Sequence, residues 1–318
     1  MFTKIWLPGA GGPASIGVIK SLRSASEFNF KIITTDSNPL SAGFSFSDAS
    51  FVLPPITSNK WLEKALNLVK KEKIELIFPT SGFDIIPLAK NSKLFKRYKT
   101  ILAFSSFRTI ELCNDKYALM KFLSRDFKLA WFSNQINKVK LPCVVKPTHG
   151  KGSRDIFVCH SRSELNYAAS KIIPKETLFQ EYLPGTEYTI DVLSDLKGKS
   201  ILAVVRVRIE TRGGISSKGK VIRQKNIERQ CMRIANKLKL KGITCFQMKE
   251  NVKGEPMLTE INPRIGGASV ISTLAGANLP LMCLKSISNE KIKMPNIKET
   301  IVLRYFEEVI LKAPPGKI

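Results

Sequence analysis

The N-terminal third of the chain alternates between short apolar runs and amphipathic segments, and this alternation narrows the possible folds more than any other feature. Apolar runs at residues 4–7, 31–35 and 74–78 predict strands. Between them, residues 15–22 and 60–71 place apolar side chains at helical spacing. Strand–helix–strand units in this order form parallel sheets with helices on both faces. The sequence therefore predicts an α/β fold that begins with a doubly wound parallel sheet.

A glycine-rich turn follows the first predicted strand, with Gly9, Gly11 and Ala14, and Asp36 ends the second strand. Read literally, this is a dinucleotide fingerprint, so an NAD-dependent dehydrogenase has to be considered. Glycine turns between a strand and a helix also serve other anionic ligands, or simply turn the chain. The rest of the sequence does not follow a dehydrogenase pattern, so this turn alone assigns no cofactor.

A hairpin is predicted near the C-terminal end of the chain. Apolar runs at residues 243–248 and 257–261 flank a polar turn that contains Gly254. If the turn is centred just before that glycine, antiparallel pairing brings Gln247 opposite Glu260. The register of the ribbon can therefore be predicted as well as its existence.

The predicted hairpin collects oxygen-bearing side chains on one face. Side chains alternate along a strand, so Glu260 and Asn262 point the same way, beside Gln247, and Arg264 follows two residues later. Mg²⁺ is commonly held by one or two carboxylates and keeps its other positions for water and substrate phosphates. The segment favours a magnesium–phosphate site, and a surface hairpin with a polar wet face is the alternative.

A second glycine-rich loop joins the predicted strands at residues 141–146 and 155–159. Gly150 and Gly152 have no side chains, so backbone N–H groups there could approach phosphate oxygens. The loop is not a Walker motif, because no Gly-Lys-Ser/Thr leads into a helix. An ordinary hairpin would have a similar sequence.

Composition excludes several classes of protein. The 318 residues contain no apolar stretch of about 18, and the chain starts directly with a strand pattern, so we expect no membrane span, no secretory signal and a cytoplasmic location. The six cysteines lack CxxC spacing and most lie in apolar runs, as reduced core thiols do. Only two histidines are present, which argues against a zinc centre or a Ser-His-Asp site.

The net charge of +25 is concentrated in part on one predicted helix. Its basic residues recur every four positions, at Arg229, Arg233, Lys237 and Lys241, opposite an apolar face. This stripe is either a solvated face or a docking surface for an acidic partner, such as nucleic acid, a carrier protein or a polyanionic substrate. No aromatic residues interleave with it, which weakens the single-stranded nucleic-acid interpretation.

Two further segments bear on function. Arg206 and Arg208 are two apart on a predicted strand, so they share a face. Residues 211–220 after them are polar and glycine-rich, and we expect them to be mobile.

Taken together, these motifs resemble the ATP-grasp superfamily, and specifically the branch of the carbamoyl-phosphate synthase large subunit and related single-copy ligases. The matching segments run from end to end: the turn at residues 9–14, Asp36-Ser37-Asn38-Pro39, Asp115-Lys116, Val145-Lys146-Pro147, residues 150–154 and 180–187, Gln247, residues 260–264 and Arg304-Tyr305-Phe306. The resemblance implies a pre-ATP-grasp domain at residues 1–112, a small subdomain with a glycine-rich flap at 113–183, and an α+β large subdomain at 184–318.

The resemblance also implies roles for individual residues. ATP would be held by Lys116, Lys146, Gly150, Gly152, Ser153, Glu181, Tyr182, Leu183 and Glu187. Mg²⁺, or Mn²⁺ in its place, would be bound by Gln247, Glu260 and Asn262, where the amide of Gln247 replaces the acid of many relatives. Arg264 would stabilise the transferred phosphoryl group. The substrate carboxylate would be gripped by Arg206, Arg208 and Lys218.

The implied activity is that of an ATP- and Mg²⁺-dependent ligase that activates a carboxylate as an acyl phosphate and couples it to an amine. The partners would be small molecules resembling amino acids, and the chain could form a homodimer. Carbamoyl-phosphate synthase has two such units in tandem and this sequence has one, so we expect a different ligase. Two alternatives are a modifier of an acidic polymer or carrier protein, and a nucleotide-binding regulator without turnover. The presence of Lys146, Glu260, Asn262 and Arg264 argues against a regulator.

Overall fold

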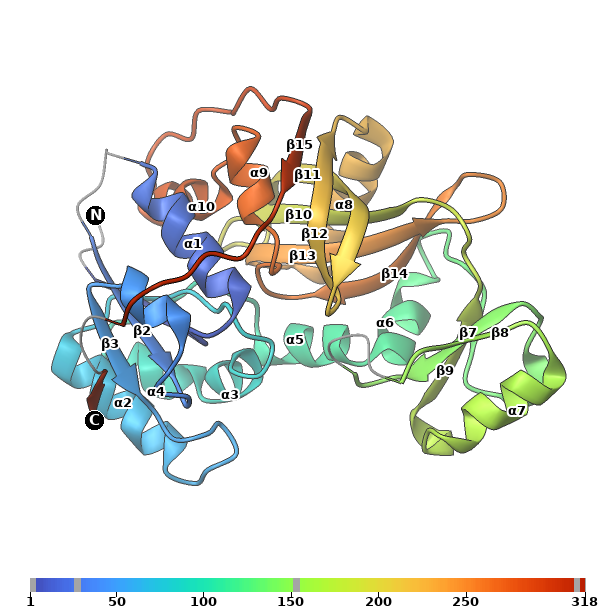
Figure 1. The fold of residues 1–318 in the computed structure, drawn as a ribbon, viewed down its shortest axis with the longest axis horizontal. Coiled ribbons are helices and arrows are strands. Elements are labelled where there is room, and N and C mark those ends of the chain that lie inside the picture. The colour runs from blue at the N-terminus through green and yellow to red at the C-terminus, as the bar shows by residue number, and fades with distance from the viewer. Residues whose placement is uncertain (1–3, 26–29, 151–154, 312–314, 318) are drawn as a thin grey trace.

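The computed structural model describes residues 4–25, 30–150, 155–311 and 315–317 of the chain. These segments form three sheets: a six-stranded N-terminal sheet, a four-stranded small sheet and a six-stranded large sheet. In Figure 1 the N-terminal sheet and the small sheet lie at opposite ends, the large sheet lies above the helices that join them, and the C-terminal segment runs back across α1 to the N-terminal sheet.

The N-terminal sheet is parallel throughout, with strand order β16-β3-β2-β1-β4-β5. Its strands are β1 (Lys4–Pro8), β2 (Lys31–Asp36), β3 (Ala49–Val52), β4 (Leu76–Ile77), β5 (Ile101–Leu102) and β16 (Gly316–Lys317). The predicted parallel sheet is confirmed. Its edge strand β16 comes from the C-terminal segment, which the sequence interpretation had grouped with the large subdomain.

Helices cover both faces of this sheet, as predicted for a doubly wound fold. The helices of this region are α1 (Pro13–Arg23), the short 3-10 helix η1 (Ala42–Phe46), α2 (Trp61–Glu72), α3 (Ile85–Lys90) and α4 (Ser92–Lys96). Ile5 and Leu7 of β1 pack in one apolar cluster with Val18 of α1, whereas Trp6 packs in another with Leu68 of α2. The two clusters follow from the alternation of side chains along a strand.

The small sheet is antiparallel, with order β6-β9-β7-β8. Its strands are β6 (Phe132–Ser133), β7 (Cys143–Pro147), β8 (Phe157–Cys159) and β9 (Thr177–Glu181). The helices in this part of the chain are α5 (Phe107–Asn114), α6 (Lys116–Leu123), η2 (Ile136–Lys138), α7 (Arg162–Ser170) and η3 (Pro174–Glu176). Helices α5 and α6 lead from the N-terminal sheet to this one (Figure 1). The predicted domain boundary after residue 112 falls inside α5.

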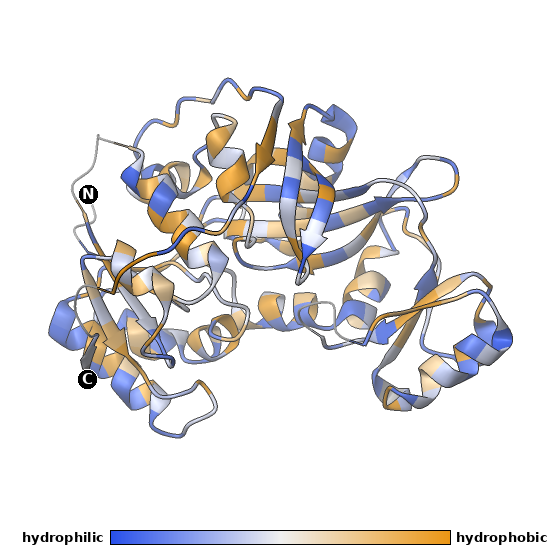
Figure 2. Ribbon diagram, in the orientation of Figure 1, coloured by the Kyte–Doolittle hydropathy of each residue, from blue (hydrophilic) through white to orange (hydrophobic). Residues whose placement is uncertain are grey.

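The large sheet has the order β14-β13-β10-β11-β12-β15 and is antiparallel. Its strands are β10 (Glu187–Ser194), β11 (Ser200–Arg212), β12 (Ile215–Ile222), β13 (Gly242–Glu250), β14 (Pro256–Asn262) and β15 (Thr300–Leu303). The helices in this part of the chain are α8 (Lys225–Leu238), α9 (Val270–Leu274) and α10 (Leu279–Ile287). Helix α8 packs on one face through Cys231 and Ile234. The other face shares an apolar cluster with α1, α9 and α10, which show hydrophobic stretches in Figure 2.

Two hairpins of the large sheet place the site. Gln247 pairs with Glu260, so the predicted register of the β13–β14 ribbon is confirmed. Residues 211–220, expected only as a polar mobile segment, extend β11 and β12 into a hairpin whose two-residue turn is Gly213-Gly214. Both glycines have positive φ, +56° and +74°, which a two-residue hairpin turn of this kind requires. Among the described residues, none of the helices has the length and apolarity needed to cross a bilayer.

Candidate functional site

Polar side chains gather on the face of the large sheet that looks toward the N-terminal domain. The pairing of β10, β11, β13 and β14 puts Thr189 opposite Arg206 and Gln247, and Cys245 opposite Asn262. Residues directly opposite each other share a face of an antiparallel sheet. One surface therefore carries carboxylates, amides and guanidinium groups, while the reverse surface is the apolar core under α8.

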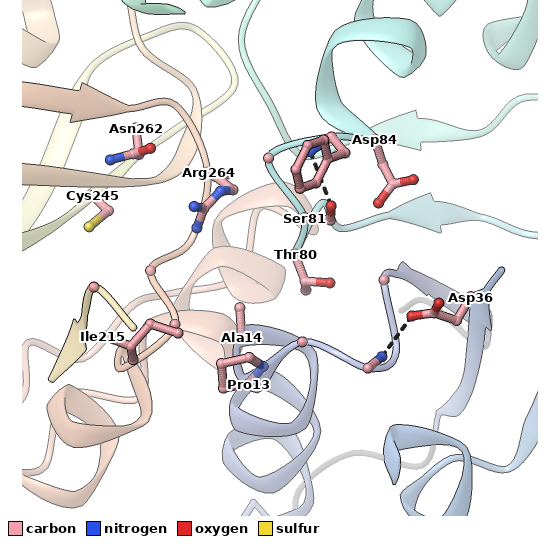
Figure 3. A pocket seen from close by; sticks show the side chains of 18 of the residues that line it. Pro13, Ala14, Asp36, Thr80, Ser81, Asp84, Ile215, Cys245, Asn262 and Arg264 are labelled. Carbon is pink, nitrogen blue, oxygen red and sulfur yellow. Dashed lines mark hydrogen bonds between the residues drawn. The ribbon is translucent and has the colours of Figure 1, made fainter. Parts of the chain in front are cut away.

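A cavity of about 630 Å³ separates this face from the N-terminal domain. Figure 3 shows Asn262, Cys245 and Arg264 on one side of it, with Ser81 and Asp84 on the other. The cavity is thus walled by arginines from the large sheet and by hydroxyl and carboxyl groups from the loops at the carboxyl ends of parallel strands. Ligands in open α/β sheets bind at that edge.

A smaller cavity of about 30 Å³ adjoins the first, and Asn262 and Arg264 line both. It is lined in addition by Lys116, Gly150 and Glu260, among others. The end of the hairpin predicted from the sequence therefore lies between two cavities: a small one lined by Lys116 and Glu260, and the large one lined by arginines.

Two lysines are buried around a single carboxylate. Lys116 Nζ lies 3.9 Å from Glu260 Oε2 and donates to the carbonyl of Gly150 at 3.1 Å. Lys146 Nζ donates to the carbonyl of Thr259 at 3.2 Å. Burial lowers the pKa of Lys146 to about 8; Lys116 also lowers it, while Glu260 opposes the shift. Two buried cations beside one anion leave an excess of positive charge that fits a phosphate group.

This lowered pKa predicts that polyphosphate binding weakens with rising pH. A bound phosphate favours the charged form of Lys146, so above pH ~8 binding must take up a proton. We expect the Kd for ADP to rise about tenfold between pH ~7 and pH ~9, measured by titration calorimetry. Lys146→Arg should bind ADP with little change over this range, because a guanidinium group stays protonated. An equal pH dependence in both proteins would contradict the prediction.

The oxygen ligands predicted for a metal ion lie together. Asn262 Nδ2 donates to Glu260 Oε1 at 2.7 Å, and Gln247 pairs with Glu260 across the ribbon. One carboxylate beside two amides is a donor set that suits Mg²⁺. The described residues contain no cluster of three or more His, Cys, Asp or Glu side chains that could hold a metal.

The residues predicted to contact adenine and ribose come from β9, β10 and their connection. Glu181 accepts from the backbone N–H of Trp131 at 3.2 Å, and Leu183 is buried. Tyr182 packs edge-on against His160, with ring centroids 5.5 Å apart. The remaining predicted nucleotide residues are Glu187, whose carboxylate pairs with Arg208 at 2.7 Å, and Gly152 and Ser153, which lie outside the described residues.

The three residues predicted to grip the substrate carboxylate have different environments. Arg206 is fully buried and forms a two-pronged pair with Asp191, with both N–O distances 2.9 Å. Arg206 and Arg208 both line the large cavity. Lys218 pairs with Glu210 at 2.8 Å and is half exposed, and it is not among the cavity-lining residues. The structure therefore brings Arg206, Arg208 and Arg264 to the cavity, with Arg206 paired to Asp191, and it leaves Lys218 outside.

The sequence interpretation missed Asp191, which organises the floor of the cavity. Besides Arg206, its carboxylate accepts from the hydroxyls of Ser269 and Ser272, both at 2.7 Å. The available signal was an acid at the centre of the apolar strand β10, because a buried charge needs a partner. The loops with Thr80 and Ser81 were also missed, and their residue types alone carry no signal for the site.

A carboxylate from the end of the neighbouring strand β2 binds the glycine turn of the N-terminal domain. Asp36 Oδ2 accepts from the N–H of Gly11 at 2.8 Å (Figure 3), and its other oxygen accepts from Asn38. The N–H of Gly11 is therefore engaged by Asp36 in this structure.

Two family models match the chain. Residues 174–309 match the family described as ATP-grasp in the biosynthetic pathway with Ter operon, and residues 11–103 match the PylC-like N-terminal domain. The chain therefore carries an ATP-grasp domain that follows an N-terminal domain of the PylC-like kind. The family resemblance indicated by the sequence motifs is confirmed.

Individual relatives agree with this assignment. D-alanine–D-alanine ligase of Thermotoga petrophila is 31% identical over 123 residues, which are 36% of this chain and 39% of that protein. The carbamoyl phosphate synthase large chain of Clostridium beijerinckii is 24% identical over 308 residues, 88% of this chain and 28% of that protein. The alignments thus span at most 39% of these two relatives.

The fold is shared with solved structures. The biotin carboxylase domain of the 2-oxoglutarate carboxylase of Hydrogenobacter thermophilus, in complex with MgADP and bicarbonate, gives a TM-score of 0.74 at 17% identity. The match covers 95% of this chain and 74% of that one. At this identity the likeness concerns the fold, and the chemistry has to be argued from the residues of this chain.

Proposed function

We propose that this chain is an ATP- and Mg²⁺-dependent ligase that activates a small carboxylate as an acyl phosphate and joins it to an amine, with amino-acid-like substrates. The observation that carries the proposal is that Asn262 and Arg264 line both cavities. A small cavity lined by Lys116 and Glu260 thus adjoins an arginine-walled cavity at these residues. Phosphoryl transfer from a nucleotide to a carboxylate needs this adjacency.

The residues divide into two groups in this proposal. Lys116 and Lys146 neutralise the nucleotide phosphates, and Glu187 accepts from the ribose hydroxyls. In the large cavity, Arg208 binds the substrate carboxylate. Arg264 stands where the two groups meet and stabilises charge on the transferred phosphoryl group. Arg206 is committed to Asp191 and supports the floor of the cavity.

Glu260, Asn262 and Gln247 would hold Mg²⁺, which neutralises phosphate oxygens when bound. The N-terminal domain closes the other side of the cavity, so the acyl phosphate is kept from bulk water and remains available to the amine.

The proposal is tested by ADP release from purified protein with ATP, Mg²⁺ and pooled carboxylates and amines. We expect release that depends on one pool, and a loss of about a hundredfold or more in Glu260→Ala, because that variant removes the one carboxylate of the metal site. Glu255→Ala is the matched control, since Glu255 lies at the far end of the same hairpin and pairs with Lys128. Absence of ADP binding to the wild-type protein would refute the proposal.

The alternative of an acidic polymer or carrier as substrate receives less support. In the basic stripe of α8, Lys237 pairs with Asp126 at 2.9 Å, and Arg233 lies over the ring of Phe127. These two side chains are engaged with the segment that follows α6. The small-molecule proposal is therefore the one that the site favours.

A further inference from the structure

The guanidinium group of Arg208 contacts two parts of the site at once. Its Nη1 donates to Glu187 Oε1 at 2.7 Å, and its Nη2 donates to the carbonyl of Gly214 at 2.9 Å. The side chain is 7% exposed, and its Nε is buried without a hydrogen-bond partner among the described residues. A buried guanidinium beside a cavity, with one unused donor, is suited to an anionic ligand.

The carbonyl that Arg208 holds belongs to the tip of the β11–β12 hairpin. Gly214, Ile215 and Ser216 at this tip all line the large cavity. Ile215 also lies against the loop after Arg264, because a Cβ added at Gly267 would come within 3.2 Å of Ile215 Cδ1 (Figure 3). The tip therefore forms a wall of the cavity. Arg208 joins it by hydrogen bonds to Glu187 on the neighbouring strand.

Glu187 connects Arg208 to the proposed nucleotide site. It lies directly across from Arg208, one place beyond the paired residues Tyr188 and Val207. The Glu187 side chain is 37% exposed, whereas that of Arg208 is almost fully buried. A carboxylate that also accepts from a ribose would lose rotational freedom, so its hold on Arg208 would strengthen.

We propose that the tip of the β11–β12 hairpin is a gate of the carboxylate cavity, and that Arg208 positions this gate and couples it to nucleotide bound at Glu187. The nucleotide coupling rests on the proposed function; the tie between Arg208 and the gate does not. Coupling between two binding sites is reciprocal, so a closed gate also favours nucleotide binding.

The test is amide hydrogen exchange of residues 213–217, with the β13–β14 turn at residues 251–255 as an internal reference. In the wild-type protein, MgADP at a saturating concentration determined by calorimetry should slow exchange at the hairpin tip about fivefold or more. Arg208→Lys keeps the charge but loses the fork, so its tip should exchange fast with and without MgADP. Glu187→Gln should behave in the same way. Arg223→Lys, at the other end of β12, is the matched control and should resemble wild type.

The outcomes separate the parts of the proposal. If the hairpin tip of Arg208→Lys exchanges at the wild-type rate, the gate is refuted. It is also refuted if this variant speeds exchange at the reference turn as much as at the tip. Measured ADP binding without slower exchange at the wild-type tip would refute the coupling. If ADP does not bind at all, the proposed function and the coupling fail together, while the comparison of Arg208→Lys with wild type still decides the gate.

Discussion

Replacing Arg264 with alanine is expected to lower substrate-dependent ADP formation by about 10²- to 10³-fold, while the Kd for ADP changes by no more than about threefold. Arg264 lines both cavities, its Nη1 donates to the carbonyl of Ile265 at 2.7 Å, and its Nε is buried without a hydrogen-bond partner in the described part of the chain. In the proposed function, a guanidinium held in this way would stabilise charge that develops during phosphoryl transfer and would contribute little to the ground state.

The measurement is steady-state ADP formation with the pool that supports turnover, next to ADP titrations by calorimetry. Arg264→Lys keeps the charge without the planar fork and should recover only part of the rate. Arg223→Ala removes an exposed guanidinium paired with Glu228 and should leave the rate unchanged. An Arg264→Ala variant within about fivefold of wild-type turnover would exclude this residue from the proposed transfer step.

The hairpin that carries the proposed metal ligands could be predicted because its pairing depends on the local sequence. Period-two alternation and a glycine turn set the pairing of Gln247 with Glu260, and the structure has that register. The ribbon also contains a bulge between Gln247 and Met248, which the sequence did not indicate. The bulge lies on the turn side of Gln247, so it leaves the relative positions of Glu260 and Asn262 as predicted.

The roles of the two arginines on β11 could not be separated from the sequence. Arg206 and Arg208 share a strand face, and a two-residue spacing says only that. Their difference comes from elements distant in sequence. Asp191 on β10 forms an ion pair with Arg206, and the serines that donate to the same carboxylate belong to α9 and the residue before it. Which partner a buried side chain binds depends on tertiary contacts that the sequence pattern does not show. The pairing of β16 with the N-terminal sheet depends on such contacts as well.

Asp191→Asn is expected to lower the free energy of unfolding by about 3–5 kcal/mol, the largest effect on stability that we predict. Asp191 has no exposed surface, and its two oxygens accept four hydrogen bonds, two of them from Arg206. An amide in its place removes the counter-charge and one acceptor, so a fully buried guanidinium loses its partner. Urea unfolding followed by circular dichroism measures the change, as a lower midpoint at an unchanged slope.

Two controls separate burial of the charge from loss of an ion pair as such. Glu255→Gln breaks the exposed pair with Lys128 and should cost less than about 1 kcal/mol. The double variant Asp191→Asn with Arg206→Met removes both charges, so it should be more stable than Asp191→Asn alone, with a coupling of about 0.5–3 kcal/mol between the two sites. If Asp191→Asn costs less than about 1 kcal/mol, Arg206 has found another partner or water, and its exclusion from the carboxylate-binding residues no longer follows.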